Sequence, residues 1–275
     1  MTLSLILLAL SITGSLLTYF LTGIYQDIAF LWLPFVLIIA YFVGLLIAQS
    51  FITFFIALFV NVKKEQKKPN PFFNFEIRNI SQVFLKMCLI KVHVKGKELL
   101  PEKKKNNAFV AVTNHISNFD HLVTMQVFHR YKVVSISKPE MEKVPSIGGV
   151  QHKAGFITID RDNAMRAMKA VRKSINFIKN DYASITIAPE GTRSKDGILK
   201  EFHPMTFMIA TNSKCPLVVV SIKNTDKVKK NFPFRITHVY VNIVKVFYPE
   251  DYENMSTKDL AQLSHDLIAK DLGQL

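Results

Sequence analysis

The N-terminal stretch Met1–Val60 carries almost no charge, and this feature constrains the fold more than any other. It contains no lysine or arginine and a single acidic residue, Asp27, whereas the rest of the chain carries all 35 basic and 20 of the 21 acidic side chains. A segment this long and this apolar cannot be a solvated surface. We therefore predict a membrane-attached protein, with a membrane-embedded helical segment over 1–60 and a basic, water-soluble remainder.

The apolar block divides into two runs. Thr2–Leu21 has about the length that spans a hydrocarbon core of ~30 Å, and the polar segment Gly23–Asp27 predicts a tight turn. The second run, Ile28–Val60, would be about 50 Å long as one helix at ~1.5 Å per residue. It must tilt, lie partly in the interface, or break near Pro34 or Gly44. We favour one span with an interfacial extension, and the missing basic residue at the N-terminus argues against a cleaved signal peptide.

A lysine cluster follows the apolar block directly. Residues 63–68 contain four lysines, which the positive-inside rule places on the cytoplasmic side and which also attract anionic headgroups. A helical hairpin would put the N-terminus on the same side, whereas three spans would put it outside. The two cysteines, Cys88 and Cys215, are too few for a disulfide framework. We therefore expect a membrane location with the soluble domain on the cytoplasmic face.

The segment 61–90 reads as a basic juxtamembrane region followed by an amphipathic helix over 72–90. Apolar residues recur there at helical spacing, namely Phe73, Ile77, Ile80, Phe84 and Met87. This helix is expected either to lie on the membrane or to cap the domain that follows.

Residues 91–275 alternate short β-branched runs with helical patterns, which predicts an α/β domain with a largely parallel mixed sheet flanked by helices. The expected strands cover 91–94, 108–113, 132–137, 155–160, 184–188, 217–222 and 236–246. The expected helices cover 120–128, 162–179, 204–211 and 256–270, and a segment that contains proline and glycine lies at 139–149. In such sheets functional sites gather where strands end and helices begin.

The first polar cluster at a strand end runs from Asn114 to Asp120 and contains His115 and Ser117. An acid five residues after a histidine can fold back onto one imidazole nitrogen, which leaves the other nitrogen free as a base. The alternative is that the polar residues only cap the following helix and that His115 lies on the surface.

The second cluster begins at Gly155 and ends in Arg161, just before an expected helix. A guanidinium next to the N–H groups of a helix N-terminus would make a phosphate site. An ion pair between Arg161 and Asp160 or Asp162 explains the pattern equally well.

The third cluster, Pro189–Ser194, follows the strand expected at 184–188. Gly191 lets the backbone approach a ligand closely, Thr192 can donate a hydrogen bond, and Arg193 supplies a planar fork that matches phosphate oxygens. Glu190 could orient Arg193, bind a substrate hydroxyl or serve the structure alone. A polar turn before a helix would look similar.

Taken together, these clusters resemble the 1-acylglycerol-3-phosphate (lysophosphatidic acid) acyltransferase family of glycerolipid acyltransferases. The resemblance covers 108–222 and includes the family's His-x-x-x-x-Asp block, its glycine–strand–arginine block and its Glu-Gly-Thr-Arg-Ser block, in order. Pro216 and the apolar run after it look like the fourth block. The segment Phe202-His203-Pro204-Met205 departs from the family, which usually carries a basic residue and a glycine after the phenylalanine.

The resemblance implies a mechanism and a set of roles. His115 would take the proton of a lysophosphatidic acid 2-hydroxyl, Asp120 would support the imidazole, and the oxygen would attack an acyl thioester directly. The implied partners are membrane lipids, lysophosphatidic acid and acyl-CoA or acyl-carrier protein, with no nucleic acid, no cofactor and no metal. The implied phosphate ligands are Arg161, Glu190, Gly191, Thr192 and Arg193, and the implied supporting residues are Asn114, Ser117, Gly155 and Pro216.

Other hypotheses remain open at this point. The acceptor could be glycerol-3-phosphate, another lysophospholipid or an amino-lipid. The excess of 15 positive charges over 61–275 would also suit a membrane-anchored binder of nucleic acid or anionic lipid. A metal-dependent phosphatase is a third hypothesis, but His115 and His121 are six residues apart and lack the i, i+4 spacing of a helical zinc pair.

Overall fold

The computed structural model describes residues 3–102, 104, 107–160, 163–194 and 196–275 of the chain. It divides into two compact units, Met1–Val60 and Asn61–Leu275, and each is described by itself.

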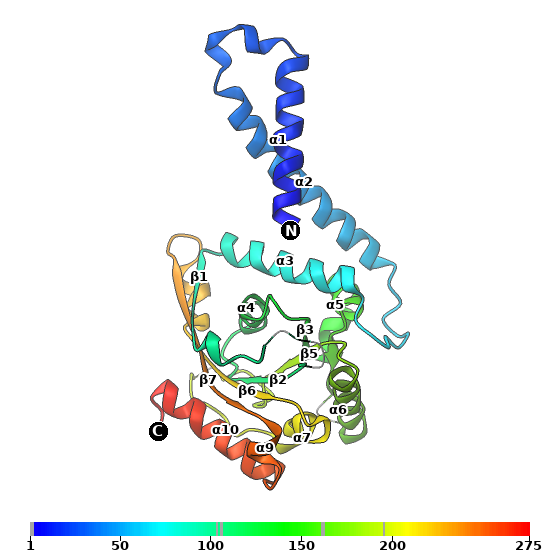
Figure 1. Ribbon diagram of the computed structural model, residues 1–275, viewed down its shortest axis with the longest axis vertical. Coiled ribbons are helices and arrows are strands. Elements are labelled where there is room, and N and C mark those ends of the chain that lie inside the picture. The colour runs from blue at the N-terminus through cyan, green and yellow to red at the C-terminus, as the bar shows by residue number, and fades with distance from the viewer. Residues whose placement is uncertain (1–2, 103, 105–106, 161–162, 195) are drawn as a thin grey trace. The chain divides into compact units, whose positions relative to one another are not determined.

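The N-terminal unit is a helical hairpin of α1 (Leu3–Leu21) and α2 (Leu33–Leu58), joined by the short 3-10 turns Ile24–Gln26 and Ile28–Phe30 (Figure 1). Ser15 Oγ donates to the carbonyl of Pro34 over 2.8 Å, which ties the two helices together. Pro34 lies in the first turn of α2, where its missing N–H is harmless, and α2 continues through Gly44. The run Ile28–Val60 is therefore not one helix, because α2 begins only at Leu33, and it does not break at Gly44.

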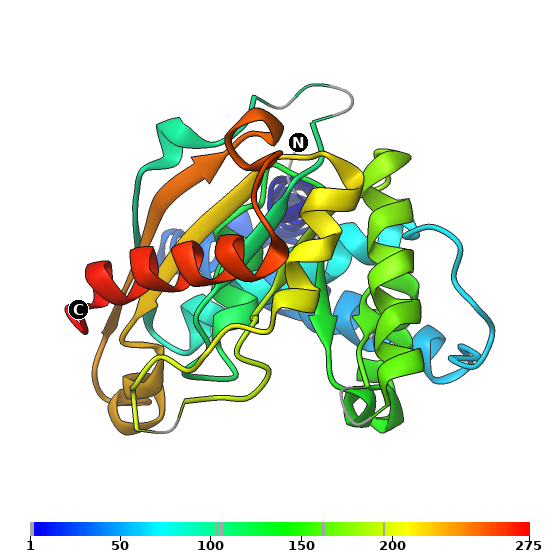
Figure 2. The same cartoon turned by 90° about the horizontal axis from the view of Figure 1, so that it is seen from below.

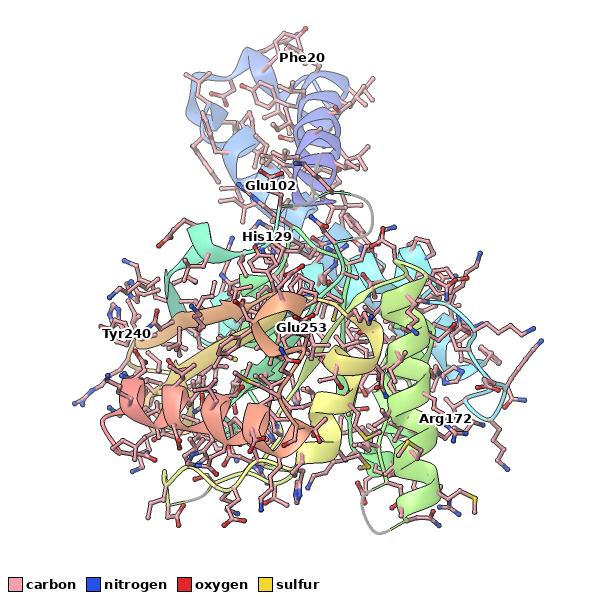
Figure 3. The ribbon with its side chains drawn as sticks, turned by 60° about the horizontal axis from the view of Figure 1, so that its bottom comes forward. Phe20, Glu102, His129, Arg172, Tyr240 and Glu253 are labelled. Carbon is pink, nitrogen blue, oxygen red and sulfur yellow. The ribbon has the colours of Figure 1, made fainter. Side chains whose placement is uncertain are left out.

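The hairpin presents apolar side chains to its surroundings. Helix α2 has the length and composition to cross a membrane, whereas the apolar stretch of α1, Leu5–Leu21, is shorter. Phe20, labelled at the tip of this unit in Figure 3, is 60% exposed, and the sticks around it are almost entirely carbon. The chain is therefore membrane-associated, as the uncharged block predicted.

The second unit is built on a seven-stranded sheet with the order β1-β7-β6-β2-β5-β3-β4. All neighbouring strands are parallel except β6 and β7, which are antiparallel. The predicted fold class, a largely parallel mixed sheet flanked by helices, is confirmed. The strands are β1 (Ile90–Lys95), β2 (Val110–Thr113), β3 (Val133–Ser137), β4 (Ile157–Thr158), β5 (Ser184–Ile187), β6 (Leu217–Lys223) and β7 (Thr237–Phe247).

Helices cover both faces of this sheet because successive strand residues alternate between them. In β2, Val110 and Val112 join the core under α6 (Ala164–Lys179), α7 (Met208–Ser213) and α10 (Thr257–Leu272). Figure 2 shows these three helices over one face of the sheet. Ala111 faces the other core, under α3 (Pro71–Met87) and α4 (Asp120–Val127). The remaining helical elements are Lys97–Leu99, Pro139–Lys143, α5 (Ile147–Ala154), Pro204–Phe207, Thr225–Lys227, α8 (Val228–Asn231) and α9 (Pro249–Tyr252).

One sequence prediction near β4 was wrong in its length: the strand expected over 155–160 shortens to the two residues of β4. Helix α5, which was not predicted, begins in the segment 139–149. Gly155 has a φ of +94° and ends α5, so it belongs to a helix terminus. Strand β4 is the edge of the sheet and pairs with β3 alone, which leaves little to stabilise a longer strand.

Helix α3 forms where predicted, and its expected apolar stripe is only partly buried, through Phe73. Phe84 and Met87 of the expected apolar stripe are exposed at 44% and 68%, while Asn74 is buried. Asn74 Nδ2 donates to the carbonyls of Val133 and Ala154 over 3.0 and 3.2 Å, so a polar side chain is satisfied inside the domain. The predicted spacing therefore found the helix, whose stripe is buried at Phe73 and exposed at Phe84 and Met87.

Candidate active site

The polar clusters that follow β2 and β5 lie at one edge of the sheet. Strands β2, β5 and β6 are parallel neighbours, so their carboxyl ends meet at the same edge. The backbone N–H of Ser194 donates to the carbonyl of His115 over 2.8 Å. This bond joins the first and third sequence clusters directly, although they lie far apart along the chain.

His115 and Asp120 form a buried pair. His115 Nδ1 lies 2.8 Å from Asp120 Oδ2, and the side chains are only 11% and 3% exposed. The same carboxylate oxygen accepts the backbone N–H groups of Ile116 and Ser117, each over 2.8 Å. In a neutral imidazole, an Nδ1–H that donates to a carboxylate leaves Nε2 as the acceptor nitrogen. The geometry therefore offers Nε2 of His115 as a base.

Helix capping does not explain the first cluster. The residue at the N-cap of α4 is Phe119, and no side chain caps this helix. Asn114 bonds to another strand: its Nδ2 donates to the carbonyl of Ile222 over 2.9 Å, and its Oδ1 accepts the N–H of Ile222 over 2.7 Å. Asn114 thus locks the end of β6 beside the loop that carries His115. Ser117 Oγ accepts the N–H of Phe119 over 3.3 Å and shapes the turn into α4.

Glu190 points into the protein. Its Oε1 accepts the N–H of His115 over 2.6 Å, and its Oε2 accepts the N–H of Lys200 over 3.1 Å. Burial raises the pKa of this carboxyl, against the lowering effect of the two N–H groups. A buried carboxylate would repel a phosphate, so Glu190 does not fit the expected role of phosphate ligand. Of the other roles considered for it, its hydrogen bonds fit a structural one.

The rest of the third cluster faces outward. Gly191 has a φ of +79°, a left-handed conformation that favours glycine, and turns the chain so that Thr192 is exposed and Arg193 half-exposed. Lys200 Nζ lies 3.1 Å from Thr192 Oγ1 and 3.2 Å from the carbonyl of Arg193. Two cationic side chains therefore flank this loop, and Lys200 was not foreseen.

The second cluster lies apart from the first. Strand β4 is three strands from β2, roughly 14 Å at ~4.8 Å per strand. Arg161 lies outside the described residues, and Asp160 Oδ2 accepts a bond from Arg166 Nη1 over 3.0 Å. Gly155 packs against Pro69, whose Cγ would be 2.7 Å from an added Cβ. Gly155 therefore supports the fold around the juxtamembrane segment.

Pro216 lies at the opposite end of β6 from the site. Its carbonyl accepts the N–H of Val110 over 3.0 Å, which starts the pairing of β6 with β2. Its contribution is to align these two strands.

Thr225 and His121 complete the surroundings of His115 and were missed from the sequence. Thr225 is fully buried, and its Oγ1 donates to Asp120 Oδ1. The His121 ring centroid lies 5.3 Å from that of His115. Thr225 follows β6 in a stretch without any local motif, so only the pairing of β6 with β2 reveals its role.

Comparisons with known proteins match acyltransferases. The family model described as Acyltransferase matches residues 91–223. A 1-acyl-sn-glycerol-3-phosphate acyltransferase of Haemophilus influenzae is 27% identical over 184 residues, which are 66% of this chain and 76% of that protein. The enzyme of the same name from Limnanthes douglasii is also 27% identical, over 66% of this chain and 64% of that protein.

A solved structure supports the fold. The crystal structure of the 1-acyl-sn-glycerophosphate acyltransferase PlsC from Thermotoga maritima has a TM-score of 0.60 and 23% sequence identity, over 73% of this chain and 78% of that one. The ordered motifs, the family model and the curated relatives agree: this chain is similar to acyltransferases, and the curated proteins that it matches are named 1-acyl-sn-glycerol-3-phosphate acyltransferases.

Proposed function

We propose that this protein transfers a fatty acyl group from an acyl thioester to the 2-hydroxyl of a 1-acylglycerol-3-phosphate and so forms phosphatidic acid. The observation that carries the proposal is the bond between Ser194 N–H and the His115 carbonyl, because it supports placing the expected base, His115, beside the loop that is flanked by Arg193 and Lys200. The thioester would be acyl-CoA or acyl-carrier protein, and no cofactor takes part.

His115 and Asp120 would perform the proton transfers. Nε2 of His115 accepts the proton of the 2-hydroxyl while the oxygen forms a bond to the thioester carbon. The C–S bond then breaks, and the imidazolium returns the proton to the leaving thiolate. Asp120 holds Nδ1–H at 2.8 Å and stabilises the transient imidazolium, the role that a carboxylate plays beside a catalytic histidine.

Arg193, Thr192 and Lys200 would bind the phosphate of the acceptor. A phosphate monoester carries up to two negative charges, and Arg193 offers it a planar fork while Lys200 adds a second positive charge. Gly191 would allow the backbone to approach the phosphate closely. The family resemblance assigns Arg161 as a further phosphate ligand. Binding at the phosphate would hold the 2-hydroxyl near His115, a contribution of positioning.

Direct transfer without an acyl-enzyme is favoured by the state of the thiols. Cys215 is buried, and burial raises its pKa to about 11; burial also raises the pKa of Cys88. A thiol is a nucleophile as the thiolate, so neither cysteine is activated at neutral pH.

The lysines of 63–68 support a cytoplasmic orientation of the domain. Both thioester donors under consideration are cytosolic molecules, so this orientation would give the site access to them.

A donor-by-acceptor assay on the detergent-solubilised full chain tests the function. Acyl-CoA and acyl-carrier protein are each offered with lysophosphatidic acid, glycerol-3-phosphate or a neutral monoacylglycerol. We expect phosphatidic acid from lysophosphatidic acid, and a fall of about 10²–10⁴-fold in His115→Ala, the loss typical of a missing general base. His129→Ala is the matched control, because His129 is exposed on the surface (Figure 3). Near-normal transfer by His115→Ala would contradict the mechanism, and preference for another acceptor would contradict the substrate.

A further inference from the structure

The segment between α8 and β7 exposes large apolar side chains. Phe232, Phe234 and Ile236 are 47%, 92% and 57% exposed. Single exposed apolar residues are ordinary on a protein surface, but three within five residues, one of them almost bare, form a projecting apolar tip. This tip is a candidate interaction surface.

The tip continues into the end of α3. The N–H of Thr237 donates to the carbonyl of Leu89 over 2.9 Å, and Ile90 pairs with Thr237 where β1 runs beside β7. Figure 1 shows the segment before β7 lying next to the junction of α3 and β1. Together the exposed side chains form a seating patch, which consists of Phe84, Met87, Leu89, Phe232, Phe234 and Ile236.

Basic residues surround the seating patch. Lys229 and Lys230 are exposed on α8 just before the tip, Arg235 is exposed within it, and Lys86 and Lys91 are exposed beside Met87 and Leu89. The single acidic residue between 224 and 236 is Asp226. An apolar centre with a basic rim complements a membrane surface that carries anionic headgroups.

The tip is held in a defined shape. The carbonyl of Asn231 accepts the N–H groups of Phe234 and Arg235 over 3.0 and 2.8 Å, and its Nδ2 donates to Thr237 Oγ1 over 3.0 Å. Since these bonds fix the backbone that carries the apolar side chains, little ordering entropy opposes their insertion into another phase.

The seating patch lies at the edge of the sheet that carries His115. Phe84 stacks on Phe119 with ring centroids 6.3 Å apart, and Phe119 precedes Asp120. On the other side, Thr225 bonds Asp120 seven residues before Phe232. The patch is therefore connected at two points to the pair that would perform the chemistry.

We propose that the seating patch inserts into the headgroup–acyl boundary of an anionic phospholipid bilayer and turns the His115 edge of the domain toward the lipid surface. A bilayer fits a projecting tip because insertion needs no complementary pocket, whereas protein interfaces place their anchors in pockets of the partner. The functional consequence, delivery of a membrane-embedded acceptor to His115, rests on the proposed function. The insertion itself does not.

Tryptophan fluorescence of the full chain in vesicles tests the insertion. In a Trp32→Phe background, which removes the single native tryptophan, Phe234→Trp introduces one indole at the tip. Tyr248→Trp is the matched control, because Tyr248 is also exposed but lies at the opposite end of β7. In vesicles of zwitterionic and anionic lipid with brominated acyl chains, we expect a blue shift and quenching at position 234 and neither at position 248.

Absence of quenching at position 234 in protein that retains acyltransferase activity would overturn the proposal and leave the proposed function standing. If acyl-carrier protein shielded that indole in the absence of vesicles, the patch would be a binding surface for the carrier protein, and the proposal of membrane insertion would be overturned as well.

A second variant tests the consequence. In Phe234→Ser/Ile236→Ser, we expect transfer to lysophosphatidic acid embedded in vesicles to fall at least about tenfold, since the burial of a large apolar side chain corresponds to roughly 10–100-fold in partition. Transfer to a short-chain, water-soluble acceptor in detergent should stay unchanged. An equal loss on both acceptors would show that the tip supports the site itself, and it would overturn membrane seating.

Discussion

Thr225 Oγ1 donates a hydrogen bond to Asp120 Oδ1 and so connects two buried residues that are 105 positions apart in the chain. The other oxygen of Asp120 receives His115 Nδ1 and two backbone N–H groups. With partners on both oxygens the carboxylate has one orientation, and that orientation directs it at the imidazole. Three elements together therefore hold His115, the expected base, in position: β2, α4 and the turn after β6.

The substitution Thr225→Val tests this connection. Valine keeps the shape of threonine but removes the donor, and a hydrogen bond to a charged group contributes roughly 1.5–3 kcal/mol. We expect kcat to fall about 10–100-fold with KM for the acceptor nearly unchanged, because the base loses its alignment while the phosphate loop stays intact. Steady-state kinetics would show it, and Thr225→Ser should restore the activity. Wild-type kcat in the valine variant would contradict the role.

Asn114→Ala should destabilise the domain. The change leaves the N–H and carbonyl of Ile222 without the partners that Asn114 gives them, and an unsatisfied buried polar group costs roughly 1–3 kcal/mol. We expect the free energy of unfolding, measured in urea titrations, to fall by about 2–4 kcal/mol for the two groups together. The control is Asn180→Ala. The side-chain amide of Asn180 donates only within the exposed end of its own helix, so this substitution should lower the free energy of unfolding by less than about 0.5 kcal/mol. Equal effects at both positions would refute the cross-link.

Glu190 gives a prediction about pH. Burial raises the pKa of this carboxyl above its ordinary value of 4.5, so the folded protein binds the proton more tightly than the unfolded chain. Stability conferred by this group therefore falls as pH rises from about 4.5 to the folded-state pKa and is constant above it. Glu190→Gln lacks this dependence.

We accordingly expect the unfolding free energy of wild type, minus that of Glu190→Gln, to decrease as the pH is raised from 4 to 7. Urea unfolding at a series of pH values measures it. Glu253→Gln serves as control, because Glu253 lies on the surface (Figure 3). A difference that grows with pH would show that the two N–H groups outweigh burial.

Arg193→Ala tests phosphate binding. Loss of the guanidinium should raise KM for lysophosphatidic acid at least about tenfold with a smaller change in kcat, since an interaction made equally in the ground and transition states affects KM alone. Transfer to a neutral monoacylglycerol should not weaken. Lys200→Met should act in the same direction because Lys200 Nζ lies beside Thr192, whereas the exposed Lys214→Met should change nothing. An equal loss on charged and neutral acceptors would argue against a phosphate site.

Much of the fold could be predicted from local patterns. The β-branched runs at 110–113, 184–187 and 217–223 became neighbouring parallel strands, because strands buried on both faces read as continuous apolar runs. The antiparallel course of β7, between β1 and β6, could not be read this way. A single strand has the same pattern in either direction, and its direction depends on the connection through α8.

The sequence by itself determined the membrane attachment and placed an acid within reach of His115. The uncharged block Met1–Val60 has no other stable environment. Asp120 follows His115 by only five residues, so its carboxylate can reach the imidazole through one turn and the first residue of the next helix. Only the tertiary structure decided that Glu190 faces inward, that Asn114 holds Ile222 and that Thr225 reaches Asp120. Each of these contacts joins segments that are distant in the chain, and such pairs meet only after the order of the strands is established.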